Sequence, residues 1–241
     1  MALFMIGIGL NDEKDITIKG LELIRQSDIV YLENYTSTLN CEISDLEGFY
    51  GKDIILADRE IVENQVDRIL EEAKSRNVAF LVVGDVFSAT THFGMFMDAK
   101  ENGIDVEIVH NTSILNVVSD TGLFLYQFGK TTSIPFNYEN VKTPINVFNE
   151  NNEKGYHTLF LLDLNPKENK FLEVSEAAQY LIANGIDENT ICIGCSRMGG
   201  KDQEIKTAML KDIELNKTPQ CLIIPGKLHF LEEEAIEKWK E

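Results

Sequence analysis

Basic residues are scarce in this chain of 241 residues. Only 22 lysines and arginines stand against 40 aspartates and glutamates, which gives a formal net charge of −18. Such an excess of negative charge repels a phosphate backbone and excludes general nucleic-acid binding. An acidic, well-solvated surface explains the charge, and a basic partner also fits it. The hydrophobic content of 44% is ordinary for a soluble globular protein.

Cysteine is also rare, since the chain has four in all. So few cysteines in a chain of this length do not form a disulfide framework, and they favour a reducing compartment. Cys192 and Cys195 form a C-x-x-C, but it lies in the strand-like run "TICIGCS". No second C-x-x-C or histidine pair supplies further zinc ligands, so we predict no metal site.

Targeting and membrane signals are missing as well. The apolar start "MALFMIGIGL" has no basic residues before it and runs directly into "NDEKD". It is therefore neither a signal peptide nor a membrane span. We expect a cytoplasmic protein without a membrane partner.

Common hydrolase and nucleotide signatures are absent. "GCSRMGG" has Met198 where the G-x-S-x-G motif needs its second glycine, and the chain has no H-E-x-x-H and no Walker lysine. "IGIGLNDEKDIT" resembles the start of a dinucleotide-binding turn, and Glu33 after the next strand would suit ribose hydroxyls. However, Asp12 stands where the third glycine belongs, and an acidic turn is unfavourable for pyrophosphate. A structural turn remains the other interpretation.

What the sequence does contain is a series of apolar, strand-like runs. Between several of them, residues 61–73 and 174–183 have helical spacing. Strands that alternate with helices predict an α/β protein with a largely parallel sheet. The runs cover residues 3–9, 28–33, 78–84, 105–110, 157–164, 190–196 and 221–226.

One stretch interrupts this alternation. Residues 131–156 contain two of the five prolines and many Asn, Glu and Lys residues, which indicates a linker followed by a short helix and a turn. We place a domain boundary near residues 133–136 and expect domains at 1–133 and 134–241. The end of the chain, "HFLEEEAIEKWKE", has the charge distribution of a helix.

Three polar residues follow strands at places where α/β folds bind ligands. Asp85, in "GDVFSATTH", either caps the next helix or faces a ligand with positive charge or hydroxyls. Ser113 either is an N-cap or presents its hydroxyl and the following amides to a ligand, with Ile114 covering an apolar ring. His229, at a helix start, either is structural or serves as a neutral hydrogen-bonding group.

Taken in order along the chain, five segments resemble the diphthine synthase family, methyltransferases of the diphthamide pathway within the tetrapyrrole methylase class. They are "FMIGIGLNDEKDIT", "GDVFSATTH", "SILNVVSDTGLFLYQFGKTTSIPF", "HTLFLLDL" and "LIIPGKLHFLEEE". The resemblance runs from Met1 to about Lys238. Its most specific part is the combination of G-D-x-x-x-A-T-T-H with T-G-L-x-L-Y-x-F-G and P-G-K-L-H.

The resemblance implies a fold of two α/β domains of the tetrapyrrole methylase type, with S-adenosyl-L-methionine in the cleft between them, and a homodimer. It also implies methylation of the amino group of the 2-(3-amino-3-carboxypropyl)histidine of translation elongation factor 2, repeated to give diphthine, with S-adenosyl-L-homocysteine as the other product. It names no catalytic base. The family's cofactor contacts correspond to Leu10, Asp85, Ser88, Ser113, Ile114, Leu164, Thr207 and His229.

The chain departs from the family at two places. Val86 replaces the usual proline after Gly-Asp, and "CSRMGGKDQEIKTAM" differs from the family's Arg-Ala-Gly-Ser type of sequence. Two alternatives stay open. One is a tetrapyrrole-methylase-class enzyme with another acceptor, and the other is a non-catalytic module that binds S-adenosylmethionine.

Overall fold

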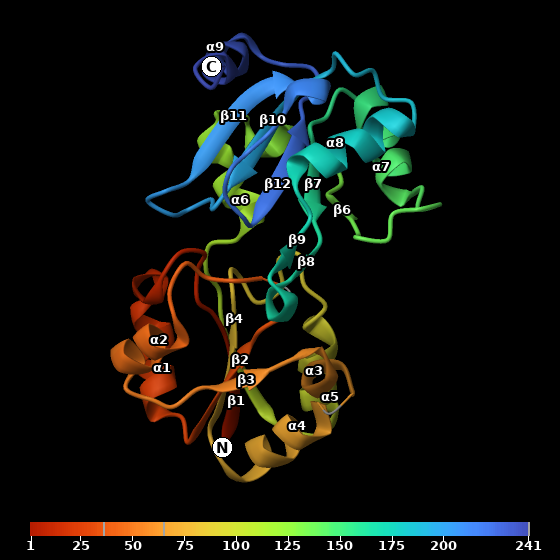
Figure 1. Cartoon of the computed structure of the whole chain (residues 1–241). Coiled ribbons are helices and arrows are strands. Elements are labelled where there is room, and N and C mark those ends of the chain that lie inside the picture. The colour runs from red at the N-terminus through yellow and green to blue at the C-terminus, as the bar shows by residue number, and fades with distance from the viewer. Residues whose placement is uncertain (36, 65, 241) are drawn as a thin grey trace. The chain divides into compact units, whose positions relative to one another are not determined.

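The computed structural model describes residues 1–35, 37–64 and 66–240. The chain divides into two compact units, Met1–Leu115 and Asn116–Glu241. Each has its own β-sheet and its own hydrophobic core (Figure 1).

Within the described part of the first unit, five strands form a fully parallel sheet in the order β3-β2-β4-β1-β5. The parallel sheet expected from the apolar runs is confirmed here. The strands are β1 (Ala2–Gly7), β2 (Ile29–Glu33), β3 (Ile55–Ala57), β4 (Val78–Val82) and β5 (Asp105–Val109).

Helices cover both faces of this sheet, because successive side chains of a strand point to opposite sides. Leu3 and Met5 of β1 pack in the core that includes α3, α4 and α5, whereas Phe4 and Ile6 pack in the core that includes α1 and α2. Figure 1 shows the two helix groups on opposite sides of the sheet. The helices are α1 (Ile18–Gln26), α2 (Ile43–Tyr50), α3 (Arg59–Asn64), α4 (Val66–Ser75) and α5 (Phe93–Glu101).

The sheet of the second unit is mixed. In the described residues its order is β11-β10-β12-β7-β6, and only the β6–β7 pair is parallel. The expectation of a largely parallel sheet is wrong for this unit. The reason is that β11 follows β10 in a hairpin and β12 then runs between β7 and β10, antiparallel to both. The strands are β6 (Thr132–Ile134), β7 (Thr158–Leu162), β10 (Ile191–Ser196), β11 (Glu204–Met209) and β12 (Gln220–Ile224).

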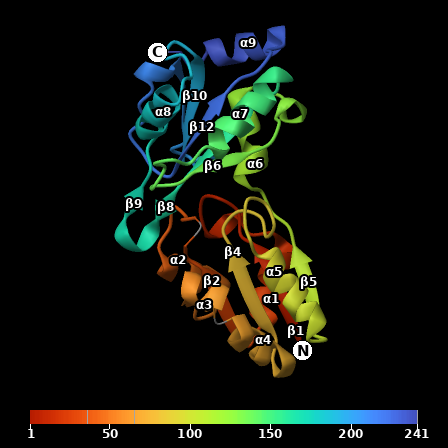
Figure 2. The same ribbon diagram turned by 90° about the vertical axis from the view of Figure 1, so that its right-hand side faces the viewer.

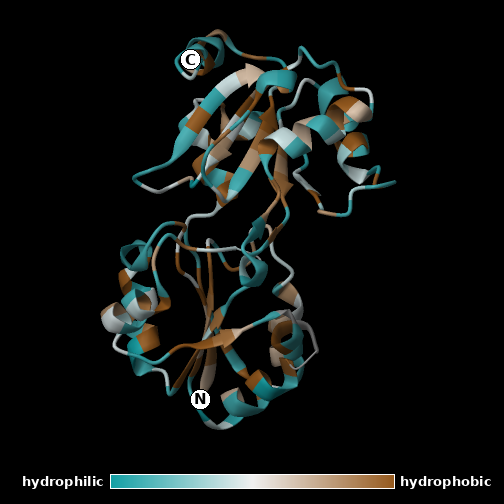
Figure 3. Cartoon of the chain, viewed as in Figure 1, coloured by the Kyte–Doolittle hydropathy of each residue, from teal (hydrophilic) through white to brown (hydrophobic). Residues whose placement is uncertain are grey.

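Two helices pack on one face of the second sheet. Phe160 and Leu222 of the strands share a core with Val174, Ala177 and Leu181 of α8, and α7 packs against the same core. A short hairpin of β8 (Leu164–Asn165) and β9 (Lys170–Phe171) extends beyond the end of β7 (Figure 2). The helices of this unit are α6 (Ile114–Val117, which begins in the first unit), α7 (Thr143–Glu153), α8 (Val174–Ala183) and α9 (Phe230–Glu237). Figure 3 shows that the central strands are mainly hydrophobic, whereas the helices carry both kinds of residue.

The division between the units lies before the boundary that we expected near residue 133. Residues 116–133 group with the second unit because they contact α9. The Phe124 amide donates to Glu232 at 2.7 Å, Trp239 Nε1 donates to the Thr121 carbonyl at 3.0 Å, and Gly122 lies against Ala235. The stretch 131–156 is therefore part of the second unit, where it forms β6 and α7.

Candidate functional site

The loops after β1 and β4 are joined at two glycines. The Gly84 amide donates to the Gly9 carbonyl at 2.7 Å, and the Gly9 amide donates to Gly84 at 3.3 Å. Both glycines have φ near +80°, a conformation that other residues rarely adopt. A Cβ placed on Gly84 would lie 3.6 Å from a methyl group of Leu10 and 3.7 Å from the Cα of Ser113. Leu10 and Ser113, expected to bind the same ligand, are therefore brought together around Gly84.

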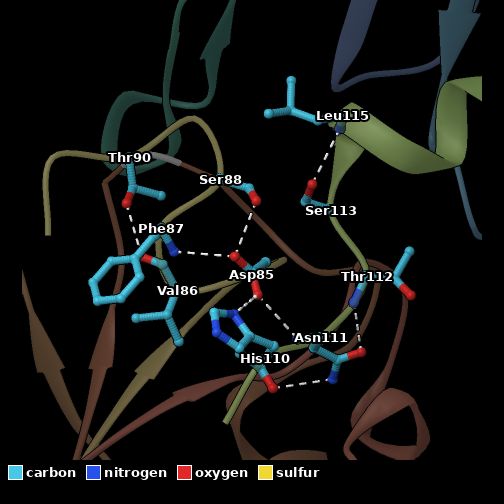
Figure 4. Close-up of polar contacts among 11 residues, drawn as sticks. Asp85, Val86, Phe87, Ser88, Thr90, His110, Asn111, Thr112, Ser113 and Leu115 are labelled. Atoms are coloured by element: carbon cyan, nitrogen blue, oxygen red, sulfur yellow. Dashed lines mark hydrogen bonds and ion pairs between the residues drawn. The ribbon is translucent and has the colours of Figure 1, made fainter. Parts of the chain in front are cut away.

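Asp85 follows Gly84 in the loop after β4 and is the centre of a hydrogen-bond network (Figure 4). Its Oδ1 accepts from the Phe87 amide at 3.1 Å and from the Ser88 hydroxyl at 2.9 Å. Its Oδ2 lies 2.8 Å from His110 Nδ1 and accepts from the Asn111 amide at 3.1 Å. The carboxylate thus interacts with two partners on each oxygen.

These contacts set the charge of Asp85. Asp85 is 6% exposed, and burial by itself would raise its pKa. The hydrogen bonds from His110, Asn111, Phe87 and Ser88 outweigh that effect and hold the pKa of Asp85 below its usual value. Asp85 is therefore ionised at neutral pH. Because its oxygens already have four partners in the protein, its first role is to hold the loop, and a direct ligand contact stays a prediction.

Asn111 was not among the residues selected from the sequence, although it crosslinks the same region. Its side-chain amide donates to the Gly7 carbonyl and to the Asp15 carbonyl, both at 3.0 Å. Its side-chain oxygen accepts from the Thr112 amide at 2.8 Å. The available signal was the polar run "HNTS" directly after a strand, in which we weighted only the serine.

The turn after β1 contains carboxylates that accept hydrogen bonds from its own backbone amides. The Asp15 carboxylate accepts from the Leu10 amide at 3.2 Å and from the Asn11 amide at 2.9 Å, and Asp12 accepts from the Lys14 amide. In a dinucleotide-binding fold such amides face a pyrophosphate. Here a carboxylate already occupies them, which disfavours the dinucleotide interpretation on a second ground besides the missing glycine.

Ser113 and Ile114 lie where β5 leads into α6. The Ser113 hydroxyl is buried and accepts from the Leu115 amide at 3.2 Å, which is the N-cap arrangement that the sequence left open. Ile114 is half-buried at the start of the helix. Ser113 therefore has a structural role, and a ligand contact from either residue stays a prediction.

The three expected contacts of the second unit come from separate elements. Leu164 is half-buried on β8 and pairs with Phe171 of β9. Thr207 lies on β11, where its amide donates to the Trp239 carbonyl at 2.9 Å. His229 is the N-cap of α9, and its Nδ1 accepts from the Leu231 amide at 3.3 Å.

The Thr207 hydroxyl, like that of Ser196, is buried without a hydrogen-bond partner among the described residues. Thr207 is 3% exposed. A buried hydroxyl without a partner costs about 1–3 kcal/mol. Because protein atoms enclose this hydroxyl, its missing partner does not by itself identify a ligand contact, and a contact of Thr207 with a cofactor stays a prediction.

The cysteines show no arrangement that would hold a metal. Cys192 packs in the core beside α8, whereas Cys195 lies on the other face of β10 opposite Cys221. Over the described ranges, no group of three or more His, Cys, Asp or Glu residues lies close enough to ligate a metal ion. No helix in these ranges is long and apolar enough to span a membrane.

Comparison with known proteins gives the family. The family of tetrapyrrole (corrin/porphyrin) methylases matches residues 2–214. A probable diphthine methyl ester synthase of Arabidopsis thaliana is 41% identical, with 99% of this chain and 98% of that protein covered. A diphthine synthase of Methanosarcina acetivorans is 39% identical, with 98% of this chain and 95% of that protein covered.

Solved structures agree. The crystal structure of a putative diphthine synthase from Entamoeba histolytica has a TM-score of 0.90 and 36% identity, and covers 100% of this chain and 98% of that chain. A crystal structure of another diphthine synthase has a TM-score of 0.93 and 35% identity, and covers 100% of this chain and 96% of that chain. The chain therefore belongs to the tetrapyrrole methylase family and, within it, to the diphthine synthases.

Proposed function

We propose that this protein is an S-adenosylmethionine-dependent methyltransferase of diphthamide biosynthesis. Its acceptor is the amino group of 2-(3-amino-3-carboxypropyl)histidine on elongation factor 2, and repeated methylation gives diphthine. The observation that carries the proposal is similarity over the full length of the chain to diphthine synthases and diphthine methyl ester synthases, at about 40% identity.

The cofactor-binding residues that we propose in the first unit are Leu10, Asp85, Ser88, Ser113 and Ile114. Their support is the convergence of Leu10 and Ser113 on Gly84, together with the Asp85 network that orients Ser88. An ionised Asp85 is also electrostatically compatible with a cofactor that carries a positive charge and no phosphate.

In the second unit we propose Leu164, Thr207 and His229. Thr207 is proposed from its place in the family resemblance, and its buried hydroxyl has no partner in the described part of the chain. His229 has its Nδ1 engaged by the Leu231 amide, so the neutral ring carries its proton on Nε2 and offers it as a donor.

Methyl transfer from S-adenosylmethionine requires few specialised protein side chains. Bound S-adenosylmethionine supplies an electrophilic methyl group on a sulfonium. The protein has to hold the acceptor nitrogen in line with it, and alignment of this kind lowers a barrier by about 7–11 kcal/mol. A free α-amino group has a pKa of about 7.7–8.0, so part of the acceptor is neutral at physiological pH. We therefore propose no side-chain base.

The relatives are named for two chemically different products. A diphthine methyl ester carries a methyl group on a carboxylate oxygen, whereas diphthine itself does not. Our proposal for this chain covers methylation of nitrogen. An ester is cleaved by mild alkali and an N-methyl group is not, so the two products can be separated in one assay.

We further propose that the protein acts in the cytoplasm as a homodimer and that elongation factor 2 is its protein substrate. The acidic net charge supports attraction to a basic surface of that factor. No nucleic acid or membrane is needed for the reaction.

The test is transfer of methyl label from S-adenosylmethionine to elongation factor 2 that bears the aminocarboxypropyl-histidine precursor, with unmodified factor as the control. Intact mass before and after mild alkali counts N-methyl and ester groups. We expect label on the precursor form only. If the protein binds the cofactor in calorimetry but labels neither form, the acceptor is a different one or the chain is a non-catalytic module.

Thr207→Val tests the cofactor contact. Valine has the shape of threonine without the hydroxyl, so the free protein should become about 1 kcal/mol more stable to unfolding as the unpaired group disappears. Affinity for S-adenosylmethionine should fall several-fold at the same time. Unchanged affinity would remove Thr207 from the proposed site.

A further inference from the structure

A histidine and a glutamate form a fully buried pair in the second unit. His157, before β7, and Glu232, in the first turn of α9, are both 0% exposed. His157 Nε2 lies 3.1 Å from Glu232 Oε1. Neither residue was selected from the sequence, and neither has a place in the chemistry described above.

The proton positions follow from the neighbours. The Gly226 amide donates to His157 Nδ1 at 2.9 Å, so Nδ1 carries a lone pair and Nε2 carries the proton. His157 is thus a neutral ring that donates to Glu232. Burial by itself would raise the pKa of Glu232, but hydrogen bonds from His229, Phe124 and His157 hold it below its usual value.

The glutamate joins three segments of the chain. Its Oε1 also accepts from the Phe124 amide at 2.7 Å, and its Oε2 accepts from the His229 amide at 2.8 Å. Through His157, the pair extends to Gly226 in "PGKLH". A single buried carboxylate therefore fixes the backbone of His229 relative to Phe124 in "TGLFLYQFG" and to His157 before β7.

The ring of His229 is held as a consequence. Its Nδ1 accepts from the Leu231 amide at 3.3 Å, and its ring lies 5.5 Å from that of Phe124 and 4.3 Å from that of Phe230, centre to centre. Glu232 fixes the His229 backbone and the Phe124 backbone together. The orientation of the imidazole therefore depends on Glu232 without direct contact between the two side chains.

Part of this arrangement is a capping box, in which Glu232 accepts from the N-cap amide of His229 and stabilises the start of α9. A buried ionised group has a large desolvation cost, and well-packed apolar residues in its place are often as stable or more so. What the carboxylate and its neutral histidine partner add is a fixed geometry with defined donors and acceptors.

We propose that His157 and Glu232 are positioning residues that hold the His229 imidazole, with its proton on Nε2, for contact with S-adenosylmethionine. This inference rests on the proposed function, since it needs His229 to contact the cofactor. It assigns the pair no contact with the reacting atoms.

The first measurement uses the unaltered protein. The chain has only four histidines, so their ring nitrogen signals can be resolved by NMR and assigned with single substitutions. We expect the Nε2–H tautomer for His157 and His229, and a shift of the His229 signals on addition of S-adenosylmethionine. If the cofactor binds and the His229 signals do not move, the inference is wrong whether or not any variant folds.

The second measurement is Glu232→Gln. A glutamine has one acceptor oxygen, so its NH₂ must face either the His229 amide or the Phe124 amide. We expect the dissociation constant for S-adenosylmethionine to rise on the order of tenfold and the His229 ring to show mixed tautomers. His157→Gln keeps a donor toward Glu232 but gives up the acceptor of the Gly226 amide, so it should weaken cofactor binding less than Glu232→Gln does.

The matched control is Gln220→Glu, which makes the reverse change at another buried position of the same unit. Gln220 is 7% exposed, accepts from the Val174 amide and donates to the Lys217 carbonyl, so glutamate there also disrupts buried hydrogen bonds. It should lower stability without weakening cofactor binding. Equal weakening by both variants, or none by Glu232→Gln, overturns the inference. If the unaltered protein does not bind S-adenosylmethionine, the proposed function itself has failed.

Discussion

Asp85→Asn isolates what the buried carboxylate of the first unit does. Asparagine has nearly the same shape but only one acceptor oxygen. If that oxygen faces Phe87 and Ser88, the NH₂ group opposes the Asn111 amide. If the side chain is turned, the NH₂ group opposes the Phe87 amide. In either orientation one backbone N–H loses its acceptor.

The size of the effect follows from this count. Hydrogen bonds to a charged group contribute about 1.5–3 kcal/mol each, and an unsatisfied buried donor costs about 1–3 kcal/mol. Part of the loss is recovered because the Ser88 hydroxyl can rotate and His110 can change tautomer. We therefore expect the free energy of unfolding of the first unit to fall by about 2–3 kcal/mol.

The effect should depend on pH in a defined direction. The folded pKa of Asp85 lies below its unfolded value, so its ionisation contributes stability above the unfolded pKa, and that contribution is lost as pH falls through the folded pKa. Asparagine does not titrate. The difference between parent and variant should thus be largest above about pH 5 and should shrink below about pH 4.

The assay has to separate the two units. The chain has one tryptophan, Trp239 in the second unit, so its fluorescence follows that unit, whereas hydrogen exchange at the Phe87 and Asn111 amides follows the loop of the first. Asp98→Asn, an exposed carboxyl on α5, is the control and should change stability by less than about 0.5 kcal/mol. If Asp85→Asn behaves like Asp98→Asn and the Asn111 amide stays protected, the carboxylate does not hold the loop.

Three further outcomes are expected. Gly9→Ala places a Cβ 2.4 Å from the Asp15 Cβ and should lower the free energy of unfolding by at least about 3 kcal/mol. The control Gly103→Ala has a similar φ and open space around the new Cβ, so it should lower that free energy by about 1–2 kcal/mol in thermal unfolding. Burial raises the pKa of Cys41 to about 11 and that of Cys192 to about 12. Iodoacetamide should therefore label the native protein slowly at neutral pH, and it should label half-buried Cys41 before buried Cys192. Labelling in the reverse order, followed by mass spectrometry, would contradict this expectation. If the acidic surface attracts elongation factor 2, kcat/KM should fall as salt is raised to physiological levels, and a constant value rejects that role.

The elements predictable from the sequence were those with strong local patterns. All seven apolar runs are strands, and the expected helix at 174–183 coincides with α8. β3, β6 and β11 were not predicted, because β3 and β6 have three residues each and β11 carries charged Glu204 and Lys206. Strand direction in the second sheet also escaped prediction, since a buried strand looks the same in a parallel and an antiparallel pair.

The candidate residues were predictable only as single positions. Asp85 and Ser113 stand out because each polar residue directly follows an apolar strand. Their partners do not stand out, because the contacts of Asp85 with His110 and Asn111 span about 25 residues of chain and exist only once β4 and β5 lie in one sheet. The same holds for His157 and Glu232, which are 75 residues apart.

The two turns of the first unit also bear on which kind of cofactor the protein can hold. The amides of Leu10 and Asn11, which could bind an anion, are taken by Asp15, and the amides of Phe87 and Asn111 are taken by Asp85. Each carboxylate both satisfies these donors and leaves negative charge where a phosphate would otherwise lie. A phosphate at either turn would meet a carboxylate and find these four amides already paired, whereas the proposed sulfonium cofactor carries no phosphate. Asp15 and Asp85 thus add to the objection that Asp12 raised against a dinucleotide in the sequence, and they are compatible with the proposed S-adenosylmethionine.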